Sequence, residues 1–131
     1  MRGHMEAIEY ITLIRNNYAK LGYEPYQWVF NYDAPPWQSL RKSLSNCRVG
    51  LIASGGIYVT GQVAFHFKDD ISFRLIPTDV NIANLRTAHF AYDQKDARLD
   101  PNVVFPIDTL RRLVKEGMIG SLTEHAFTFM G

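Results

Sequence analysis

A near-continuous run of apolar residues, followed at once by two glycines, constrains the fold more than any other segment of this chain. The run falls within Arg48–Thr60 and includes Val49, Leu51, Ile52 and Ala53. Strands with so few polar positions are typical of a parallel sheet that helices cover on both faces. We therefore expect a central strand here, in an α/β fold of three layers whose sheet is mostly parallel.

Two helices are predicted from the spacing of apolar residues. Over Glu6–Lys20 these residues recur at intervals of three and four, which is the pattern of an amphipathic helix, and Gly22 supplies a stop. Pro106–Glu116 has a proline at its start, one apolar face and Gly117 just beyond its end. Proline is favoured at the first helical position and glycine just after the last one, so a helix is predicted there as well.

Two further strands and a connector are predicted from local composition. Ser72–Ile76 alternates in polarity and is followed by Pro77, which cannot donate a hydrogen bond to a strand ladder. A third strand is expected around Thr87–Tyr92. Tyr23–Pro36 is aromatic and ends in two prolines, so we expect an extended connector, with a short edge strand as the alternative.

Length and charge indicate a single globular domain. The chain has 131 residues, 47% of them hydrophobic, with 14 Lys and Arg against 13 Asp and Glu. One domain is the default at this length, and the balanced charge argues against a general binder of nucleic acid or of acidic membranes. Residues 1–5 are interpreted as an expression leader, so the predicted α/β domain covers residues 6–131.

Cys47 is the only cysteine of the chain. A single thiol excludes an intramolecular disulfide framework and a zinc site built from several thiolates. No apolar stretch approaches the roughly 20 residues that a transmembrane helix needs, and the N-terminus lacks the pattern of a signal peptide. We expect a cytoplasmic protein that binds no membrane and no nucleic acid, with Cys47 as an inert thiol.

Two sets of residues in the middle of the chain could contact a small substrate. The loop of Ser54, Gly55 and Gly56 follows the apolar strand, where open α/β sheets place ligands, and its N–H groups could approach an anion; the alternative is a tight turn. Arg74 lies among apolar neighbours, close in sequence to Asp70. It either pairs with a carboxylate and braces its own loop, or binds a substrate carboxylate through its guanidinium fork.

A second polar set comprises His89, Tyr92, Asp93, Asp100 and Asn102. On a helix, residues four apart share a face, so His89 and Asp93 could form the His–carboxylate pair that is used for proton transfer. The alternatives are a hydrogen-bonded structural histidine and a metal ligand. Because no third ligand converges on the pair, we predict no metal site.

Several short motifs occur in order along the chain. They are Ala34-Pro35-Pro36-Trp37, Leu51-Ile52-Ala53-Ser54-Gly55-Gly56-Ile57, Asp70 with Ser72 and Arg74, His89 with Tyr92-Asp93, Asp100-Pro101-Asn102-Val103-Val104-Phe105-Pro106, Ile119-Gly120-Ser121-Leu122 and Phe129-Met130-Gly131. This series, which runs from about Pro35 to Gly131, resembles the N-terminal half of the selenoprotein B family of glycine/sarcosine/betaine and D-proline reductases.

The resemblance implies reductive cleavage of a carbon–nitrogen bond in a small amino acid or betaine. In the family, a selenolate or thiolate displaces the amine, a pyruvoyl group on a separate subunit captures primary or secondary amines, and thiols reduce the selenium again. The family's nucleophile lies in a Cys-rich motif downstream of the Phe-Met-Gly segment, and Cys47 does not match that position. We therefore expect no cofactor in this chain, and a pyruvoyl group or selenocysteine or cysteine on a partner chain.

Three explanations stay open for the missing nucleophile: a split enzyme, a homologue without redox chemistry, and a fragment of a longer subunit. If the family's site is shared, His89 and Asp93 would protonate the departing amine. The residues that would bind substrate are Ser54, Gly55, Gly56, Arg74, Asp100 and Asn102. A hydrolase that uses Ser54 is disfavoured, because no GxSxG elbow surrounds this serine.

The sequence and the resemblance together predict a three-layer, Rossmann-like sheet that a partner chain or a missing C-terminal half completes. The expected function is that of a subunit in a reductase complex acting on a small amine or amino acid. The expected partner is a second reductase subunit or a second copy of the chain. The alternative function is a non-catalytic assembly or ligand-binding subunit of such a complex.

Overall fold

In the described residues, strands occur only in the second of the two units into which the chain divides, Met1–Gln38 and Ser39–Gly131. The computed structural model describes residues 9–25, 27, 29–66 and 70–130. The predicted leader at residues 1–5 lies outside the described residues, as do two aromatic residues of the predicted connector, Tyr26 and Trp28.

The first unit contains helix α1 (Tyr10–Lys20), which confirms the predicted helix over that range. Gly22 ends it as predicted: at φ 80° this residue donates its N–H to Ala19 O at 3.0 Å. Glycine adopts this left-handed conformation without a steric penalty, which is why it is common just after a helix. The described residues of Tyr23–Pro36 form no strand, and their side chains are exposed.

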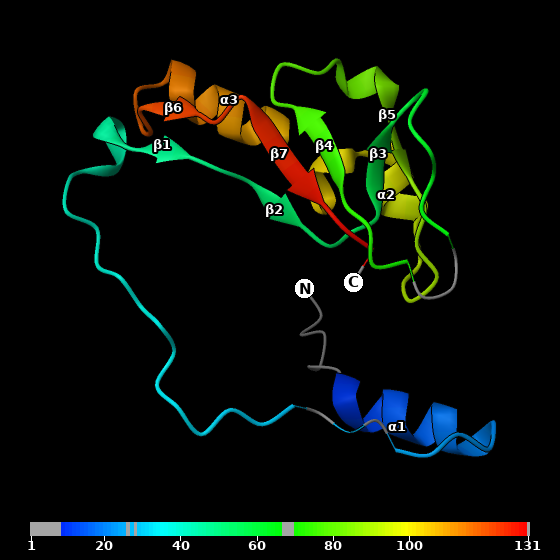
Figure 1. Cartoon of the computed structure of the whole chain (residues 1–131). Coiled ribbons are helices and arrows are strands. Elements are labelled where there is room, and N and C mark those ends of the chain that lie inside the picture. Colours follow the sequence, from blue (N-terminus) through cyan, green and yellow to red (C-terminus); the bar gives the residue numbers. More distant parts are fainter. Residues whose placement is uncertain (1–8, 26, 28, 67–69, 131) are drawn as a thin grey trace, which may run out of the picture. The chain divides into compact units, whose positions relative to one another are not determined.

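A three-stranded sheet organises the second unit, in the order β2 (Ile52–Ala53), β7 (His125–Thr128) and β4 (Arg74–Pro77) (Figure 1). β2 runs parallel to β7, whereas β4 runs antiparallel to it. A second parallel pair, β1 (Arg48–Val49) with β6 (Ser121–Leu122), continues the segments of β2 and β7 toward their N-terminal ends.

A bulge interrupts the parallel pairing of these two segments. Two residues separate Val49 from Ile52, but four separate their respective partners, Leu122 and Phe127. The hydroxyl of Thr78 donates to a backbone carbonyl within the bulge at 2.6 Å. The two extra residues thus have a defined place and do not disturb the pairing on either side.

An antiparallel pair, β3 (Ile57–Val59) with β5 (Leu85–Thr87), is joined to β4 by one side chain. Gln62 accepts the Val59 N–H through Oε1 at 2.9 Å and donates from Nε2 to Leu75 O at 2.8 Å. The amide therefore takes the place of a backbone ladder between β3 and β4.

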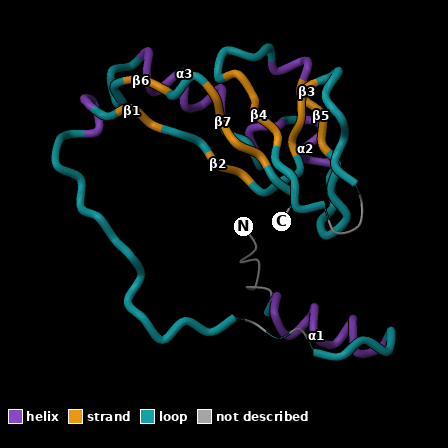
Figure 2. Tube along the Cα trace, viewed as in Figure 1, coloured by secondary structure: helices purple, strands orange, loops and turns teal. Residues whose placement is uncertain are grey.

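Helix α3 (Ile107–Lys115) confirms the predicted second helix, and Gly117 after it has φ 72°. A short helix α2 (Lys95–Leu99) and three 3₁₀ turns lie in the connections: η1 (Leu44–Asn46), η2 (Ile82–Asn84) and η3 (Pro101–Val103) (Figure 2). None of the helices in the described part of the chain has the length and hydropathy to span a bilayer.

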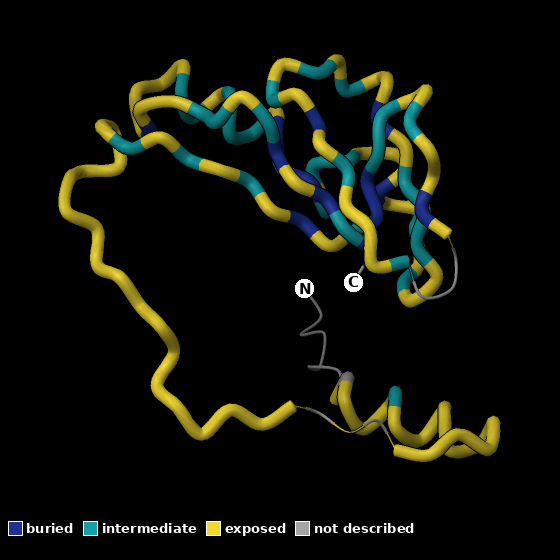
Figure 3. The backbone as a smooth tube through the Cα atoms, viewed as in Figure 1, coloured by how far each residue is buried: buried dark blue, intermediate teal, exposed yellow. Residues whose placement is uncertain are grey.

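The core of the second unit lies where β3, β4 and β7 meet the segment that leads into α3 (Figure 3). Its largest fully buried side chains are Phe105, Ile57, Ile76, Ile107 and Thr128. The one polar member, Thr128, donates its hydroxyl to Ile57 O at 2.5 Å, which satisfies the buried oxygen.

The α/β class is confirmed, in the form of small parallel and mixed sheets. The prediction of a central strand in Arg48–Thr60 is wrong: the run is divided into β1, β2 and β3, and β2 lies at the edge of its sheet. Ile52 in β2 is 73% exposed, so this strand is not covered on both faces in the described structure. The central strand is β7, which the sequence patterns do not predict.

The other two predicted strands are displaced by a few residues. Ser72–Ile76 corresponds to β4, which begins and ends later, at Arg74 and Pro77. The third predicted strand is wrong over residues 88–92, because β5 already ends at Thr87 and the chain then turns irregularly toward α2.

Candidate functional site

The glycine loop that follows β2 is tightly enclosed by its own chain. Gly56 has φ 70°, and a Cβ on it would lie 2.1 Å from Ala88 O. A Cβ on Gly55 would lie 2.7 Å from the Cβ of Val104. Only glycine fits at these positions, because other residues would collide with the neighbouring segments. The Gly56 N–H donates to Phe129 O at 2.8 Å, so this N–H already has a partner within the chain.

Tyr92 links the irregular segment after β5 to this loop. Its hydroxyl donates to Gly55 O at 2.6 Å, across 37 residues of sequence. Its ring lies against that of His89, with 4.6 Å between the centroids. Burial raises the pKa of the Tyr92 hydroxyl above its ordinary value, and the charge of Arg98 partly opposes this shift. The hydroxyl therefore stays a hydrogen-bond donor over the physiological range.

His89 and Asp93 lie in the same segment but do not form the predicted pair. The condition for a shared face is not met, because residues 88–94 are not helical. His89 Nδ1 accepts the N–H of Ala91 at 3.0 Å, and Asp93 Oδ1 accepts the N–H of Lys95 at 3.0 Å. No hydrogen bond or ion pair joins the two side chains in the described structure. With Nδ1 acting as acceptor, the neutral imidazole carries its proton on Nε2.

Arg74 is engaged on all sides by its own loop. Its Nε donates to Val63 O at 2.7 Å and its guanidinium to the Ser72 hydroxyl at 2.7 Å. The guanidinium lies 3.6 Å from the Asp70 carboxylate and 4.3 Å above the centroid of the Phe65 ring. This is the arrangement of the bracing alternative, in which the charge is compensated within the protein.

Asp70 is held in its ionised form by the same loop. The Ser72 side chain donates to this carboxylate, as do the N–H groups of His66 and Ser72. Together with the nearby charge of Arg74, these bonds lower the pKa of Asp70 to about 2. The bond from the Ser72 side chain has the largest effect, and the charge of Arg74 has the smallest.

Asp100 and Asn102 form a cap where η3 leads into α3. Asp100 Oδ1 accepts from the Asn102 N–H at 3.0 Å and from its Nδ2 at 2.9 Å, and these bonds lower the pKa of Asp100. Asn102 Oδ1 in turn accepts the N–H groups of Asp108 and Thr109, in the first turn of α3, at 3.1 and 3.3 Å. Both side chains thus satisfy backbone groups at helix starts.

The structure brings part of the predicted site together. The glycine loop meets His89 and Tyr92 on one side and Val104, two residues after Asn102, on the other. No hydrogen bond or ion pair joins Arg74 to this group within the described residues. Ser54 is exposed beside the loop.

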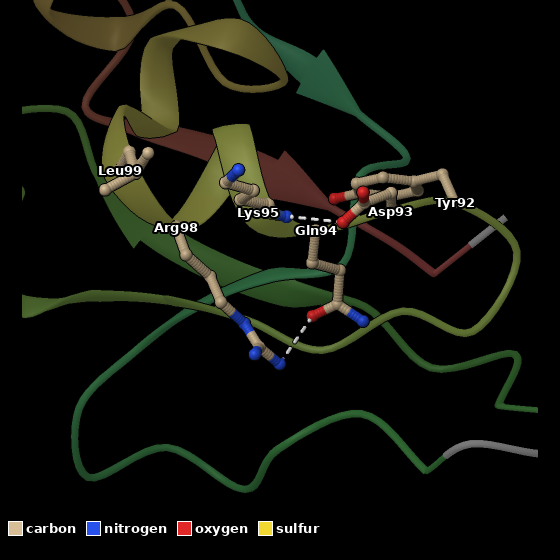
Figure 4. A pocket seen from close by; sticks show the side chains of 6 residues that line it. All are labelled: Tyr92, Asp93, Gln94, Lys95, Arg98 and Leu99. Carbon is tan, nitrogen blue, oxygen red and sulfur yellow. Dashed lines mark hydrogen bonds between the residues drawn. The ribbon is translucent and has the colours of Figure 1, made fainter.

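An open depression adjoins this group, with a volume of about 540 Å³ (Figure 4). It is lined by Tyr92, Asp93, Gln94, Lys95, Arg98 and Leu99. The guanidinium of Arg98 donates to Gln94 Oε1 at 3.0 Å, and the two side chains point toward one another in the figure. Of these residues, Tyr92 and Asp93 belong to the polar set predicted from the sequence, and only Asp93 was given a role. The others lack a sequence signal, because single polar residues at a helix start are common on protein surfaces.

Cys47 lies apart from this group. It follows η1, where its thiol donates to Ser43 O at 3.3 Å, and it lines a separate depression with Lys42 and Arg48. Within the described part of the chain, no group of three His, Cys, Asp or Glu side chains could hold a metal ion.

Comparison with known proteins places the chain in a family. The model of the family described as glycine/sarcosine/betaine reductase selenoprotein B matches residues 20–131. The chain belongs to this family. Among its relatives, D-proline reductase subunit gamma of Acetoanaerobium sticklandii is 36% identical over 97 residues, which are 74% of this chain and 40% of the relative.

Two further relatives come from related complexes. Glycine reductase complex component B subunit gamma of Symbiobacterium thermophilum is 29% identical, over 99% of this chain and 31% of the relative. Sarcosine reductase complex component B subunit beta of Peptoclostridium acidaminophilum is 28% identical, over 76% of this chain and 24% of the relative. The chain therefore spans less than half the length of each of these relatives. No solved structure matches it.

Proposed function

We propose that this chain acts within a cytoplasmic reductase complex that cleaves a carbon–nitrogen bond of a small amino acid or betaine. The observation that carries the proposal is the family match over residues 20–131, together with relatives named as subunits of D-proline, glycine and sarcosine reductases. The candidate substrates are accordingly D-proline, glycine, sarcosine and betaine.

The nucleophile of this reaction belongs outside the 131 residues. Cys47, the only thiol, donates to Ser43 O and lies apart from the glycine loop and His89. A selenocysteine or cysteine on a further chain, or on residues that follow these, supplies the attacking chalcogen, and a pyruvoyl group on a partner holds primary and secondary amines. The chalcogen bonds to the carbon as the carbon–nitrogen bond breaks, and the electron pair of the broken bond leaves with the amine. Two added thiols then cleave the chalcogen–carbon bond reductively and are oxidised to a disulfide.

Within this complex, His89 is proposed to give a proton to the leaving amine. In the neutral ring Nδ1 accepts the Ala91 N–H, so Nε2 is the nitrogen available to the amine; proton transfer requires the imidazolium, whose Nδ1 proton displaces the Ala91 N–H. The ring is held against Tyr92, whose hydroxyl is bonded to the glycine loop. Asp93 would act on the amine by charge and not through His89, and Ser54, Gly55 and Gly56 would shape the wall against which the substrate lies. Asp100 and Asn102 would act by fixing the segment that encloses Gly55, and Arg74 by bracing β4.

A non-catalytic role is the second candidate, and one observation favours it. The predicted binding groups of Arg74, Asp100, Asn102 and Gly56 all have partners within the chain. A subunit that only supports the catalytic chain would show such a pattern. In either role, we propose that further residues, on a partner or a continuing chain, complete the small sheets into a three-layer, Rossmann-like arrangement.

The test is amine release by the complex purified from its native host under reducing conditions. Deletion of the chain should abolish release from at least one of the four substrates, or ring opening in the case of D-proline. Retention of all four activities without this chain would contradict the proposal.

Two histidine variants separate the two roles. His89→Gln should lower turnover roughly 100-fold or more, the usual contribution of a positioned general acid. His66→Gln, at an exposed histidine of the β3–β4 connection, is the matched control and should leave turnover unchanged. An assembled complex with full activity in His89→Gln would assign the non-catalytic role.

A further inference from the structure

One face of the β2–β7–β4 sheet is apolar and uncovered. In β7 the side chains alternate: Ala126 and Thr128 are buried, whereas Phe127 is 40% exposed. Phe127 pairs with Ile52 of β2 and with Leu75 of β4, so these three side chains form a row across the sheet. Ile52 is 73% and Leu75 42% exposed.

Aromatic rings extend this row along the sheet. Phe73, which precedes β4, is 51% exposed, and its ring centroid lies 5.7 Å from that of Phe127 and 6.0 Å from that of Phe129. We call Ile52, Phe73, Leu75, Phe127 and Phe129 the open face. All five side chains are apolar; along β7 the same side of the sheet continues to the partly buried His125, opposite Pro77.

The opposite face of the same strands is the core. Ala53, Ile76, Ala126 and Thr128 are buried there, next to Phe105 and Ile107. The sheet therefore has one covered and one uncovered apolar face, where an antiparallel sheet exposed to water would carry polar residues. Contiguous exposed apolar surface of this kind is typical of an interaction site.

We propose that an amphipathic helix from the part of the reductase subunit outside this chain packs on the open face. The proposal rests on the proposed function, since the occupant is a segment of the same reductase subunit. The docking helix would carry a stripe of aliphatic side chains along one face. These side chains would lie between the rings of Phe73, Phe127 and Phe129.

Three observations favour this occupant. The pairs β1–β6 and β2–β7 are parallel, and parallel pairing is typical of α/β sheets that helices cover on both faces. The continuous apolar run in Arg48–Thr60 has the pattern of a doubly covered strand, which the described structure covers on one face only. Finally, the relatives extend well beyond the matched segment, since it makes up 40% or less of their length, so they contain further chain for such a layer.

The experiment places a photo-crosslinker, p-benzoyl-phenylalanine, at Phe127 in the chain produced in its native host. Crosslinked peptides are sequenced by mass spectrometry. The matched control carries the crosslinker at Met118, which is 60% exposed beyond α3 and outside the open face. We expect the crosslinker at position 127 to capture a peptide of a selenoprotein B family subunit. This peptide should come from a region of the subunit that does not align with residues 20–131 of this chain. The crosslinker at position 118 should not capture it.

A charge introduced on the open face should reduce the yield of this crosslinked peptide at least tenfold. Two variants test this, Ile52→Lys and Leu75→Lys, each combined with the crosslinker at position 127. Both side chains are exposed, and circular dichroism of the purified variants shows whether the fold is kept. Crosslinks from 127 to a second copy of this chain, to residues 9–38, or to nothing would overturn the docking proposal.

Amine release measured in the same preparations separates the two proposals. If amine release depends on this chain but position 127 forms no crosslink to a peptide of the selenoprotein B family, only the docking proposal is rejected. If position 127 forms that crosslink but amine release from all four substrates is independent of this chain, only the proposed function is rejected.

Discussion

The Tyr92 hydroxyl donates to the carbonyl of Gly55 at 2.6 Å and thereby ties the segment before α2 to the loop after β2. The bond joins two residues that are 37 positions apart in the sequence. It holds Tyr92, and with it the adjacent ring of His89, beside the glycine loop. The ring and the bond together keep two otherwise irregular segments at a fixed separation.

Tyr92→Phe should lower the free energy of unfolding by about 1–2 kcal/mol, because the Gly55 carbonyl loses its partner while the ring stays in place. The measurement is urea denaturation of the chain near pH 7. A loss below about 0.3 kcal/mol would mean that water replaces the hydroxyl at no cost.

The same residue should make stability depend on alkaline pH. Burial raises the pKa of Tyr92 in the folded state above the ordinary value of 10.0. Its contribution is therefore fully present below pH 10 and is lost as the pH rises through the folded-state pKa. Thermal unfolding between pH 8 and pH 11 should show a steeper decline in the parent chain than in Tyr92→Phe. Identical slopes would contradict this prediction.

Asp70 should remain ionised to an unusually low pH. Hydrogen bonds from the Ser72 side chain and from backbone N–H groups lower its pKa to about 2, against an ordinary value of 3.8. Its contribution to stability is present above pH 3.8 and is lost as the pH falls through about 2. A ¹³C NMR titration of the carboxyl carbons measures this directly. Ser72→Ala should move the pKa back upward, and an unchanged midpoint would exclude the serine as the cause.

Arg74→Lys tests whether this arginine braces the protein or binds substrate. Lysine cannot reproduce the fork that contacts Val63 O, the Ser72 hydroxyl and Asp70, so the free energy of unfolding should fall by roughly 2–4 kcal/mol. The KM of the complex should stay within about twofold, since no donor is left for substrate. A stable variant with a strongly raised KM would instead support recognition of a substrate carboxylate.

Gly56→Ala should be far more harmful than Gly61→Ala, although both glycines have positive φ. At Gly61 (φ 97°) no atom lies within 4 Å of an added Cβ, so only the backbone penalty of about 1 kcal/mol applies. At Gly56 the added carbon would meet Ala88 O at 2.1 Å, which we expect to cost more than about 3 kcal/mol. Chemical denaturation of both variants gives the comparison, and equal losses would show that the loop can move away.

Local signals explain which elements the sequence predicts well. α3 lies between Pro106 and Gly117, which mark its ends whatever surrounds it, and Pro77 likewise marks the end of β4. β7 carries no such signal, because its position in the sheet depends on pairing with β2, more than 70 residues earlier in the chain. Propensity and periodicity describe neighbours in sequence and cannot detect a long-range partner.

The site shows the same limit. Asp100 and Asn102, which the family resemblance implies as substrate-binding residues, cap η3 and α3 in the structure. An Asp-Pro-Asn run before an apolar helical pattern is itself a capping signal, so their position could have been predicted. The partnership of Tyr92 with Gly55 could not, because nothing in the sequence links a single tyrosine to a glycine carbonyl 37 residues away.

The bulge between β6 and β7 determines which length changes this protein can accept. It adds two residues, an even number, so Leu122 before it and Ala126 and Thr128 after it all still face the core. Since side chains in a strand alternate with a period of two, one residue gained or lost here would turn β7 over and bring Phe127 inward. Evolution can therefore lengthen or shorten this stretch in pairs, but not by single residues, without rebuilding the interior.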